Sequence, residues 1–176
     1  MKQYYFPFDQ GKITLIDSEG IVDHICILAR QEPTQEHCVL ALAQRKSDCV
    51  YELIDSCSIG EMGGSTTENY AMIPKKVSLA LIRLCARQEL VPVIIHTHTP
   101  GICPAEPVIF SKKDQLFMEQ FSKVAIAQSL RNPCIFLVTN GQSLLICETG
   151  SMSKQYFQKE KLCYAKAKLG FPDDCP

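Results

Sequence analysis

The sequence lacks the features that mark membrane, secreted and nucleic-acid-binding proteins. No segment approaches the ~18 consecutive apolar residues that a transmembrane helix needs, and residues 1–16 contain no continuous apolar stretch of the kind that a secretory signal carries. The formal net charge is only −1, so there is no broad cationic field to favour nucleic acid or an anionic membrane surface. We therefore expect an intracellular, cytoplasmic protein.

The sequence also lacks any C-x-x-C pair, although it contains 10 cysteines in 176 residues. This proportion falls below the roughly 8–10% of a short disulfide-rich scaffold. In a chain without an export signal, thiols in apolar surroundings pack as small hydrophobes, so we expect reduced cysteines rather than disulfides or a zinc finger. The cysteines that lie in or beside apolar stretches are Cys26, Cys38, Cys49, Cys85, Cys134, Cys147 and Cys163.

The length and composition are those of one α/β domain with a sizeable core. The chain is 46% apolar and 21% charged, as is usual for a soluble globular protein. Helical and strand periodicities alternate along it without an internal repeat, which predicts a central mixed β-sheet flanked by helices. We expect a single domain over residues 1–176, with its core at about 10–150 and a polar, helical C-terminal extension at 151–176.

Periodicity and turn residues place the individual elements. Ser18 is predicted to cap the first helix, which ends before Pro33, and Pro74 to lie in the first turn of the second helix. The glycine-rich segment 56–69 is predicted to be an exposed, mobile loop. The expected strands are 12–16, 36–44, 49–54, 90–98, 134–140 and 143–148, and the expected helices are 20–31, 75–88 and 111–130.

An H-x-H motif ends the most apolar of these strands. Side chains at positions i and i+2 of a strand point to the same face, so His96 and His98 can address one point while Thr97 points away. This arrangement suits two imidazole nitrogens on one zinc ion. The alternative interpretation is a pair of histidines at the exposed end of a strand, without a metal.

A Ser-x-x-Asp step follows the proline-rich loop. Ser111 and Asp114 stand where a capping box would begin the third helix. A loop that returns from the histidine strand could instead place Asp114 as an oxygen ligand, with Cys103 or Glu106 as other candidates for a third ligand. Two histidines, one carboxylate and a water molecule would make a catalytic zinc site with an open position.

These motifs, taken in their order along the chain, resemble a known family. A glutamate opens the early apolar strand EHCVLALA, H-T-H ends a later central strand, and S-x-x-D opens a helix, as in the JAMM (MPN+, Prok-JAB) zinc metalloproteases. The order of helices and strands at about 10–150 is similar to that family as well. The resemblance implies a single JAB/MPN-type domain, although the interval between the second histidine and the aspartate is longer here.

The resemblance assigns a role to each motif residue. His96, His98 and Asp114 would be the ligands of one catalytic Zn²⁺, and Glu36 the general base that takes a proton from the metal-bound water. Ser111 would supply the hydroxyl that stabilises the tetrahedral oxyanion. Glu36 opens its strand, so without the resemblance it would be interpreted as a solvated charge.

The resemblance also implies a substrate. Members of the family cleave the peptide or isopeptide bond after the C-terminal tail of ubiquitin or a ubiquitin-like protein, so a deubiquitinase-like hydrolase is expected. The segment 56–69 is a candidate clamp that would hold such a tail by β-augmentation. Two alternatives remain open: a processing peptidase for a ubiquitin-like sulfur-carrier precursor, and a catalytically silent scaffold or interaction module of the MPN type.

Overall fold

The computed structural model describes residues 1–8, 11–66, 71–99, 108–149 and 163–168. These residues form an eight-stranded mixed sheet in the order β1-β2-β4-β3-β7-β8-β9-β10, with β5 and β6 as a separate pair. The strands of the large sheet are β1 (Lys2–Phe8), β2 (Gly11–Asp17), β3 (Cys38–Ser47), β4 (Val50–Ser58), β7 (Val91–Thr97), β8 (Cys134–Thr139), β9 (Ser143–Thr149) and β10 (Cys163–Lys168). The small pair is β5 (Ser65–Thr66) and β6 (Ala71–Met72), and the helices are α1 (Ile21–Gln31), η1 (Gly60–Met62), α2 (Lys75–Gln88) and α3 (Lys112–Ala127).

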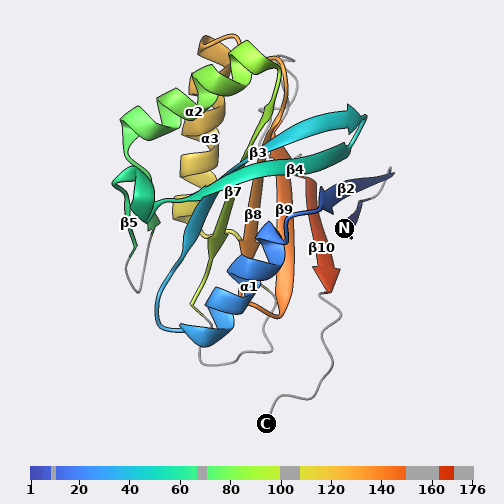
Figure 1. Cartoon of the computed structure of the whole chain (residues 1–176), viewed down its shortest axis with the longest axis vertical. Coiled ribbons are helices and arrows are strands. Elements are labelled where there is room, and N and C mark those ends of the chain that lie inside the picture. Colours follow the sequence, from blue (N-terminus) through green and yellow to red (C-terminus); the bar gives the residue numbers. More distant parts are fainter. Residues whose placement is uncertain (9–10, 67–70, 100–107, 150–162, 169–176) are drawn as a thin grey trace.

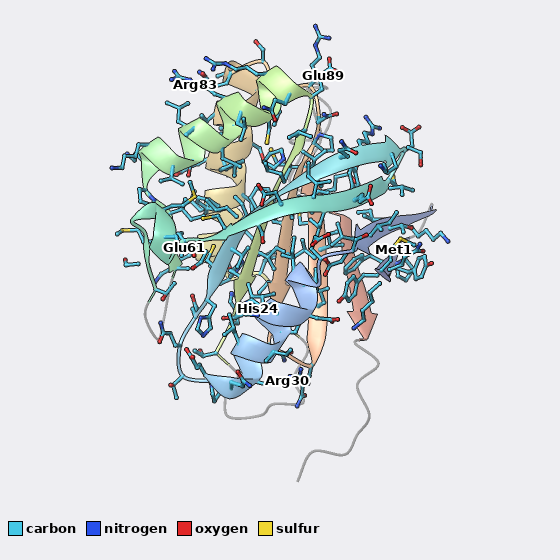
Figure 2. The ribbon with its side chains drawn as sticks, in the orientation of Figure 1. Met1, His24, Arg30, Glu61, Arg83 and Glu89 are labelled. Atoms are coloured by element: carbon cyan, nitrogen blue, oxygen red, sulfur yellow. The ribbon has the colours of Figure 1, made fainter. Side chains whose placement is uncertain are left out.

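Helices cover both faces of the sheet, which gives the protein two apolar cores (Figure 1). Alternate residues of β7 divide between them: Val93 and Ile95 pack toward α1, whereas Ile94 packs toward α2 and α3. A strand that is buried on both faces needs an almost continuous apolar sequence, and β7 has one as far as Ile95. Polar side chains such as His24 on α1 and Arg83 on α2 lie on the outer faces of these helices (Figure 2).

The sheet curves so strongly that its two terminal strands, β1 and β10, contact each other. The pairs β2–β4 and β7–β8 are parallel, and the remaining neighbours are antiparallel. The parallel β7–β8 pair has α3 as its crossover, so the start of α3 lies at the end of β7. Because β7 is a central strand, the H-x-H motif at its C-terminal end lies near the middle of the sheet.

The expected α/β architecture is confirmed: each predicted strand and helix between residues 12 and 148 is present, with shifted boundaries. The start of α1 is different, because the N-cap residue is Gly20 and Asp17, rather than Ser18, supplies the side-chain acceptor. The Asp17 carboxylate accepts hydrogen bonds from the backbone N–H groups of Ile21 (3.0 Å) and Val22 (2.8 Å). Gly20 takes a left-handed conformation at φ 74°, which turns the chain so that the end of β2 faces these donors.

The C-terminal extension is not helical where it is described. Cys163–Lys168 forms β10 and pairs with β9 in antiparallel register. The sequence CYAKAK alternates small or apolar residues with lysine, a period of two that favours a strand over a helix. The rest of the predicted helical segment, 151–162 and 169–176, lies outside the described residues.

Two further segments differ from expectation. Strand β1 was not predicted, although Tyr4 and Phe6 alternate with exposed residues and are buried against α1. The predicted loop at 56–69 is more ordered than expected, because β4 runs to Ser58 and Ile59 is buried. Residues 67–70 of that loop lie outside the described part.

Two features of the described residues bear on the class of protein that the sequence predicts. Among the described residues, Cys26, Cys38, Cys49, Cys57, Cys85, Cys134 and Cys147 form no disulfide bonds, as expected for reduced cysteines. No helix in the described part of the chain has both the length and the apolar character needed to cross a membrane.

Candidate metal centre

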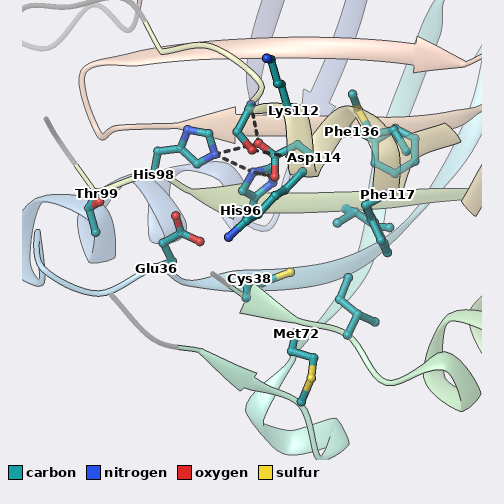
Figure 3. A pocket seen from close by; sticks show the side chains of 16 residues that line it. Glu36, Cys38, Met72, His96, His98, Thr99, Lys112, Asp114, Phe117 and Phe136 are labelled. Carbon is teal, nitrogen blue, oxygen red and sulfur yellow. Dashed lines mark hydrogen bonds and ion pairs between the residues drawn. The ribbon is translucent and has the colours of Figure 1, made fainter. Parts of the chain in front are cut away.

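The backbone of β7 and its neighbours orients the two histidines. His96 pairs with Cys38 of β3 on one side and with Val138 of β8 on the other. Beyond the end of the strand, the N–H of His98 donates to the carbonyl oxygen of Thr139 at 2.9 Å, so the extended conformation continues. Both imidazoles therefore lie on the same face of the sheet and point into one pocket (Figure 3).

Asp114 reaches the histidines from the first turn of α3. Ser111 is the N-cap, and its hydroxyl oxygen accepts a hydrogen bond from the Asp114 N–H at 3.2 Å. In return, the Ser111 N–H donates to Oδ2 of Asp114 at 2.7 Å, which completes a capping box. The capping box fixes the position of the Asp114 carboxylate, and the same carboxylate faces both imidazoles.

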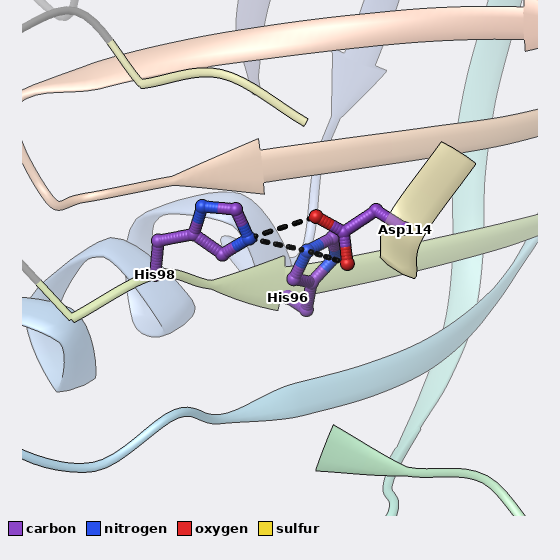
Figure 4. Close-up of side chains that lie close together, drawn as sticks. All are labelled: His96, His98 and Asp114. Atoms are coloured by element: carbon purple, nitrogen blue, oxygen red, sulfur yellow. Dashed lines mark hydrogen bonds and ion pairs between the residues drawn. The ribbon is translucent and has the colours of Figure 1, made fainter. Parts of the chain in front are cut away.

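Three ligand-type side chains converge at this point (Figure 4). The Nε2 atoms of His96 and His98 lie 3.2 Å apart, and Nε2 of His98 lies 3.0 Å from Oδ2 of Asp114. The Nε2 atom of His96 lies 3.3 Å from Oδ1, the other oxygen of the same carboxylate, so that the three side chains form a triangle. Their side chains are 13%, 21% and 20% exposed, so the triangle is largely shielded but can still be reached from the pocket.

The dimensions of this triangle fit a small cation. Zinc ligands at about 2.0–2.1 Å in a tetrahedral arrangement lie about 3.3–3.4 Å from one another. The observed separations of 3.0–3.3 Å are close to that value. His96, His98 and Asp114 therefore form a group that could hold a metal ion.

Electrostatics favour the ligand form of the carboxylate. Burial alone would raise the pKa of Asp114, but hydrogen bonds from His96, His98 and Ser111 outweigh it and hold the pKa well below its usual range. The carboxylate is consequently ionised at neutral pH. This is the protonation state that binding to a metal ion requires.

Glu36 lies beside the triangle because β3 and β7 stay bonded beyond their regular pairing. The Thr97 N–H donates to the carbonyl oxygen of His37 at 2.8 Å, and the His37 N–H donates to the Thr97 hydroxyl oxygen at 2.7 Å. These bonds hold Glu36 beside the histidines at the C-terminal end of β7. Its carboxylate points into the space in front of His98 and His96 (Figure 3).

The surroundings of Glu36 act on its pKa in the opposite sense from those of Asp114. Burial is the largest effect and raises the pKa of Glu36, and the negative charge of Asp114 raises it further. The neighbouring histidines, His98 and His96, lower it in part. The net result is a carboxyl group that gains a proton more readily than an exposed glutamate.

The predicted site residues Glu36, His96, His98, Ser111 and Asp114 all line one pocket of about 740 Å³ (Figure 3). The structure thus brings together every residue that the sequence motifs singled out. Cys103 and Glu106, the other candidates for a third ligand, lie outside the described residues.

Sequence reasoning missed two contributors to this site. Thr97 is buried and holds the start of β3 through His37, but a threonine between two histidines gives no such signal in advance. Phe117 lines the pocket three residues after Asp114, and its position on the same face of α3 could have been found from helical spacing.

No protein-family model matches the sequence, and no curated protein matches it. A solution structure of a protein from Desulfitobacterium hafniense matches 77% of this chain and 84% of its own length, at 12% identity and a TM-score of 0.45.

Proposed function

We propose that this protein is a zinc-dependent peptidase or isopeptidase of the JAMM type. Its substrate bond would follow the C-terminal tail of ubiquitin or a ubiquitin-like protein, as the resemblance of its motifs implies. The observation that carries the proposal is the convergence of His96, His98 and Asp114 in a pocket that also contains the Glu36 carboxylate.

The donor set supports zinc as the metal. Two imidazole nitrogens and one carboxylate oxygen are the ligands of hydrolytic zinc sites, in which a further position stays open for water or substrate. When bound, zinc supplies Lewis acidity, which makes a water molecule acidic and polarises a carbonyl group. His96, His98 and Asp114 would hold it, and the low pKa of Asp114 keeps that ligand ionised.

Glu36 has the properties of the proton acceptor and donor. A general base works best when its pKa lies near the working pH, and burial moves the pKa of Glu36 upward from its ordinary value. Glu36 takes the proton of the attacking water and returns it to the leaving amine. Glu36 lines the same pocket as the three candidate ligands.

The hydroxyl group of Ser111 can donate a hydrogen bond to a reacting group. In the capping box its hydroxyl oxygen acts as an acceptor for the Asp114 N–H, and that bond does not use the hydroxyl hydrogen. Ser111 lines the pocket, so it donates this hydrogen to the oxyanion that forms when the carbonyl is attacked.

One observation favours a second function. The capping box is complete, so Ser111 and Asp114 have a purely structural explanation, as they would in a catalytically silent scaffold. A processing peptidase for a sulfur-carrier precursor would use the same chemistry on a different ubiquitin-like tail. In either case, described cysteines without disulfide bonds fit a reducing compartment such as the cytoplasm.

Cleavage of a panel of ubiquitin and ubiquitin-like fusions tests the proposal, with intact mass as the readout. We expect a fusion to be cut at the end of its ubiquitin-like part, with activity lost on chelation and restored by zinc. His24→Ala, on α1 and outside the pocket, is the control variant and should cleave normally. A protein that binds one zinc ion and a fusion protein but leaves every bond intact would be a scaffold.

A further inference from the structure

The pocket extends beyond the metal ligands along α3. Asp114 and Phe117 are three residues apart, so they lie on the same face of the helix and line the same pocket. The polar end holds Glu36 and the metal group, whereas the other end is lined by apolar side chains. These include Ile94 and Phe136 of the sheet, both almost fully buried.

Aromatic packing fixes the wall of this apolar end. The rings of Phe117 and Phe136 meet edge to face, with centroids 6.2 Å apart and planes at 88°. Phe121 supports both from behind, at 5.8 Å from Phe117 and 5.7 Å from Phe136. A wall held by three interlocked rings is rigid, and Ala71 and Ile73 line the pocket from the segment before α2.

We infer that this apolar end is a subsite for a large apolar side chain of the substrate, on a residue that flanks the bond to be cleaved. The inference rests on the proposed function and adds the substrate class. A volume of about 740 Å³ lies in the range of specific ligand sites, which combine apolar walls with a few convergent polar groups. The charged side chains of Lys112 and Lys113 also line the pocket, from the turn of α3 that carries Asp114.

The continuity of the two ends determines what the subsite receives. A carbonyl group beside Glu36 and His96 leaves the neighbouring side chain of the same substrate next to Phe117. Glycine would leave this end unfilled, whereas leucine or phenylalanine would fill it and lose its water-exposed surface. Where the acyl side of the bond is a tail of small residues, the apolar side chain belongs to the residue on the amine side.

Peptides that differ only in one flanking residue test the preference. Glycine, alanine, leucine and phenylalanine are placed in turn on each side of the cleaved bond, and kcat/KM is measured with the zinc-loaded chain. We expect leucine or phenylalanine to exceed glycine by about tenfold or more on one side, as apolar pockets discriminate by 10–200-fold per methylene. Equal rates for glycine and leucine on both sides would overturn the subsite.

Two variants tie the preference to this end of the pocket. Phe117→Ala should lower the leucine-to-glycine ratio about tenfold, whereas Leu116→Ala, a change at the exposed neighbour on the same helix, should leave it unchanged. Ala71→Leu narrows the pocket without removing a core side chain, and should reduce cleavage of the phenylalanine peptide while sparing the glycine peptide. Substrate preferences that are the same as in the parent protein in both Phe117→Ala and Ala71→Leu would contradict the inference.

A binding experiment separates this inference from the proposed function. N-acetyl-leucinamide and N-acetylglycinamide are titrated into the metal-free full chain, and methyl resonances of Met118 and Ile94 are followed by NMR. Saturable changes in methyl chemical shift with N-acetyl-leucinamide, but not with N-acetylglycinamide, support the subsite. This result holds even if no peptide or fusion is cleaved. Cleavage of a ubiquitin-like fusion without such shifts would leave the proposed function standing and remove the subsite.

Discussion

At the residue scale, Asp114 connects the start of a helix to the candidate metal centre. Its Oδ2 atom accepts the Ser111 N–H at 2.7 Å and faces Nε2 of His98 at 3.0 Å. A capping box costs little rotamer freedom beyond what the helix start already requires, so it orients a ligand before any metal binds. The two interpretations of S-x-x-D that compete in the sequence are thus compatible in the structure.

Glu36→Gln separates the proposed base from the ligands. The amide has the shape of the carboxylic acid but cannot take a proton, so we expect zinc to be retained and cleavage to fall by about 10²–10⁴-fold or more. Zinc content and rate are measured on the same sample. Glu19→Gln, on an exposed residue outside the pocket, is the matched control and should behave as the parent protein. Unchanged cleavage by zinc-loaded Glu36→Gln would exclude this base.

Ser111→Ala distinguishes a cap from a catalytic hydroxyl. Loss of the cap should reduce the free energy of unfolding by about 0.5–2 kcal/mol. Loss of a hydrogen bond to the oxyanion should also reduce kcat by about 10²–10³-fold. Ser111→Thr keeps both functions and should rescue stability and rate together. If Ser111→Ala loses stability alone, with an unchanged rate per folded molecule, the hydroxyl is only a cap.

At the scale of the element, the end of β7 organises the site through its backbone. Thr97 faces away from the pocket, yet its N–H and hydroxyl oxygen both bond to the backbone of His37. The histidines on either side of it share the opposite face. One short segment therefore holds the ligands and, through β3, also the proposed base.

Thr97→Val tests this connection. Valine keeps the shape of threonine but leaves the His37 N–H without its 2.7 Å acceptor, which should cost roughly 1–3 kcal/mol of folding free energy. We expect zinc to stay bound and kcat to fall, because Glu36 is less well held than the ligands. Thr14→Val, at a buried threonine of β2, is the control. An equal fall in kcat for both variants would indicate a general loss of rigidity instead.

A second element, β1, depends on an acidic residue of α1. Lys2 and the Tyr4 hydroxyl each donate to Oδ1 of Asp23 at 2.6 Å. Burial alone would raise the pKa of Asp23, but these two hydrogen bonds lower it below its ordinary value. A pKa that is lower in the folded than in the unfolded chain stabilises the fold at neutral pH.

The stabilisation by Asp23 should be lost in acid. It is present above the unfolded pKa of about 3.9 and disappears as the pH falls through the lower folded value. Thermal melts of the parent and Asp23→Asn should differ at pH 7, by about 1 kcal/mol or less for this exposed pair, and should converge toward pH 2. Asp48→Asn, at a 94% exposed aspartate, is the control. A difference that persists at pH 2 would contradict the electrostatic origin.

An element could be predicted from the sequence when the interactions that determine it lie within a short segment of the chain. The apolar run before His96 and the Ser111 cap are local signals, and both elements were predicted. The cap by Asp17 was missed because it depends on a left-handed turn at Gly20, which no periodicity reveals. Strand β10 is expected as a helix because the short alternation in AKAK is a weak signal without its pairing partner β9, which lies far away in the sequence.

At the scale of the whole molecule, the order of the strands assembles the site. Glu36, the histidines and Asp114 come from three separate parts of the sequence, and their spacing along the chain gives no distances. They meet because β3 and β7 are neighbours and α3 starts where β7 ends. The sequence could name the candidate residues, but only the sheet order shows that they share one pocket.

The central claim is that His96, His98 and Asp114 hold one zinc ion. Elemental analysis of the full chain, after zinc addition and removal of excess metal by gel filtration, tests it most directly. We expect about one zinc ion per chain in the parent and in His24→Ala, and loss of that ion in His98→Ala. A zinc-free parent protein, or a fully occupied His98→Ala variant, would contradict the account.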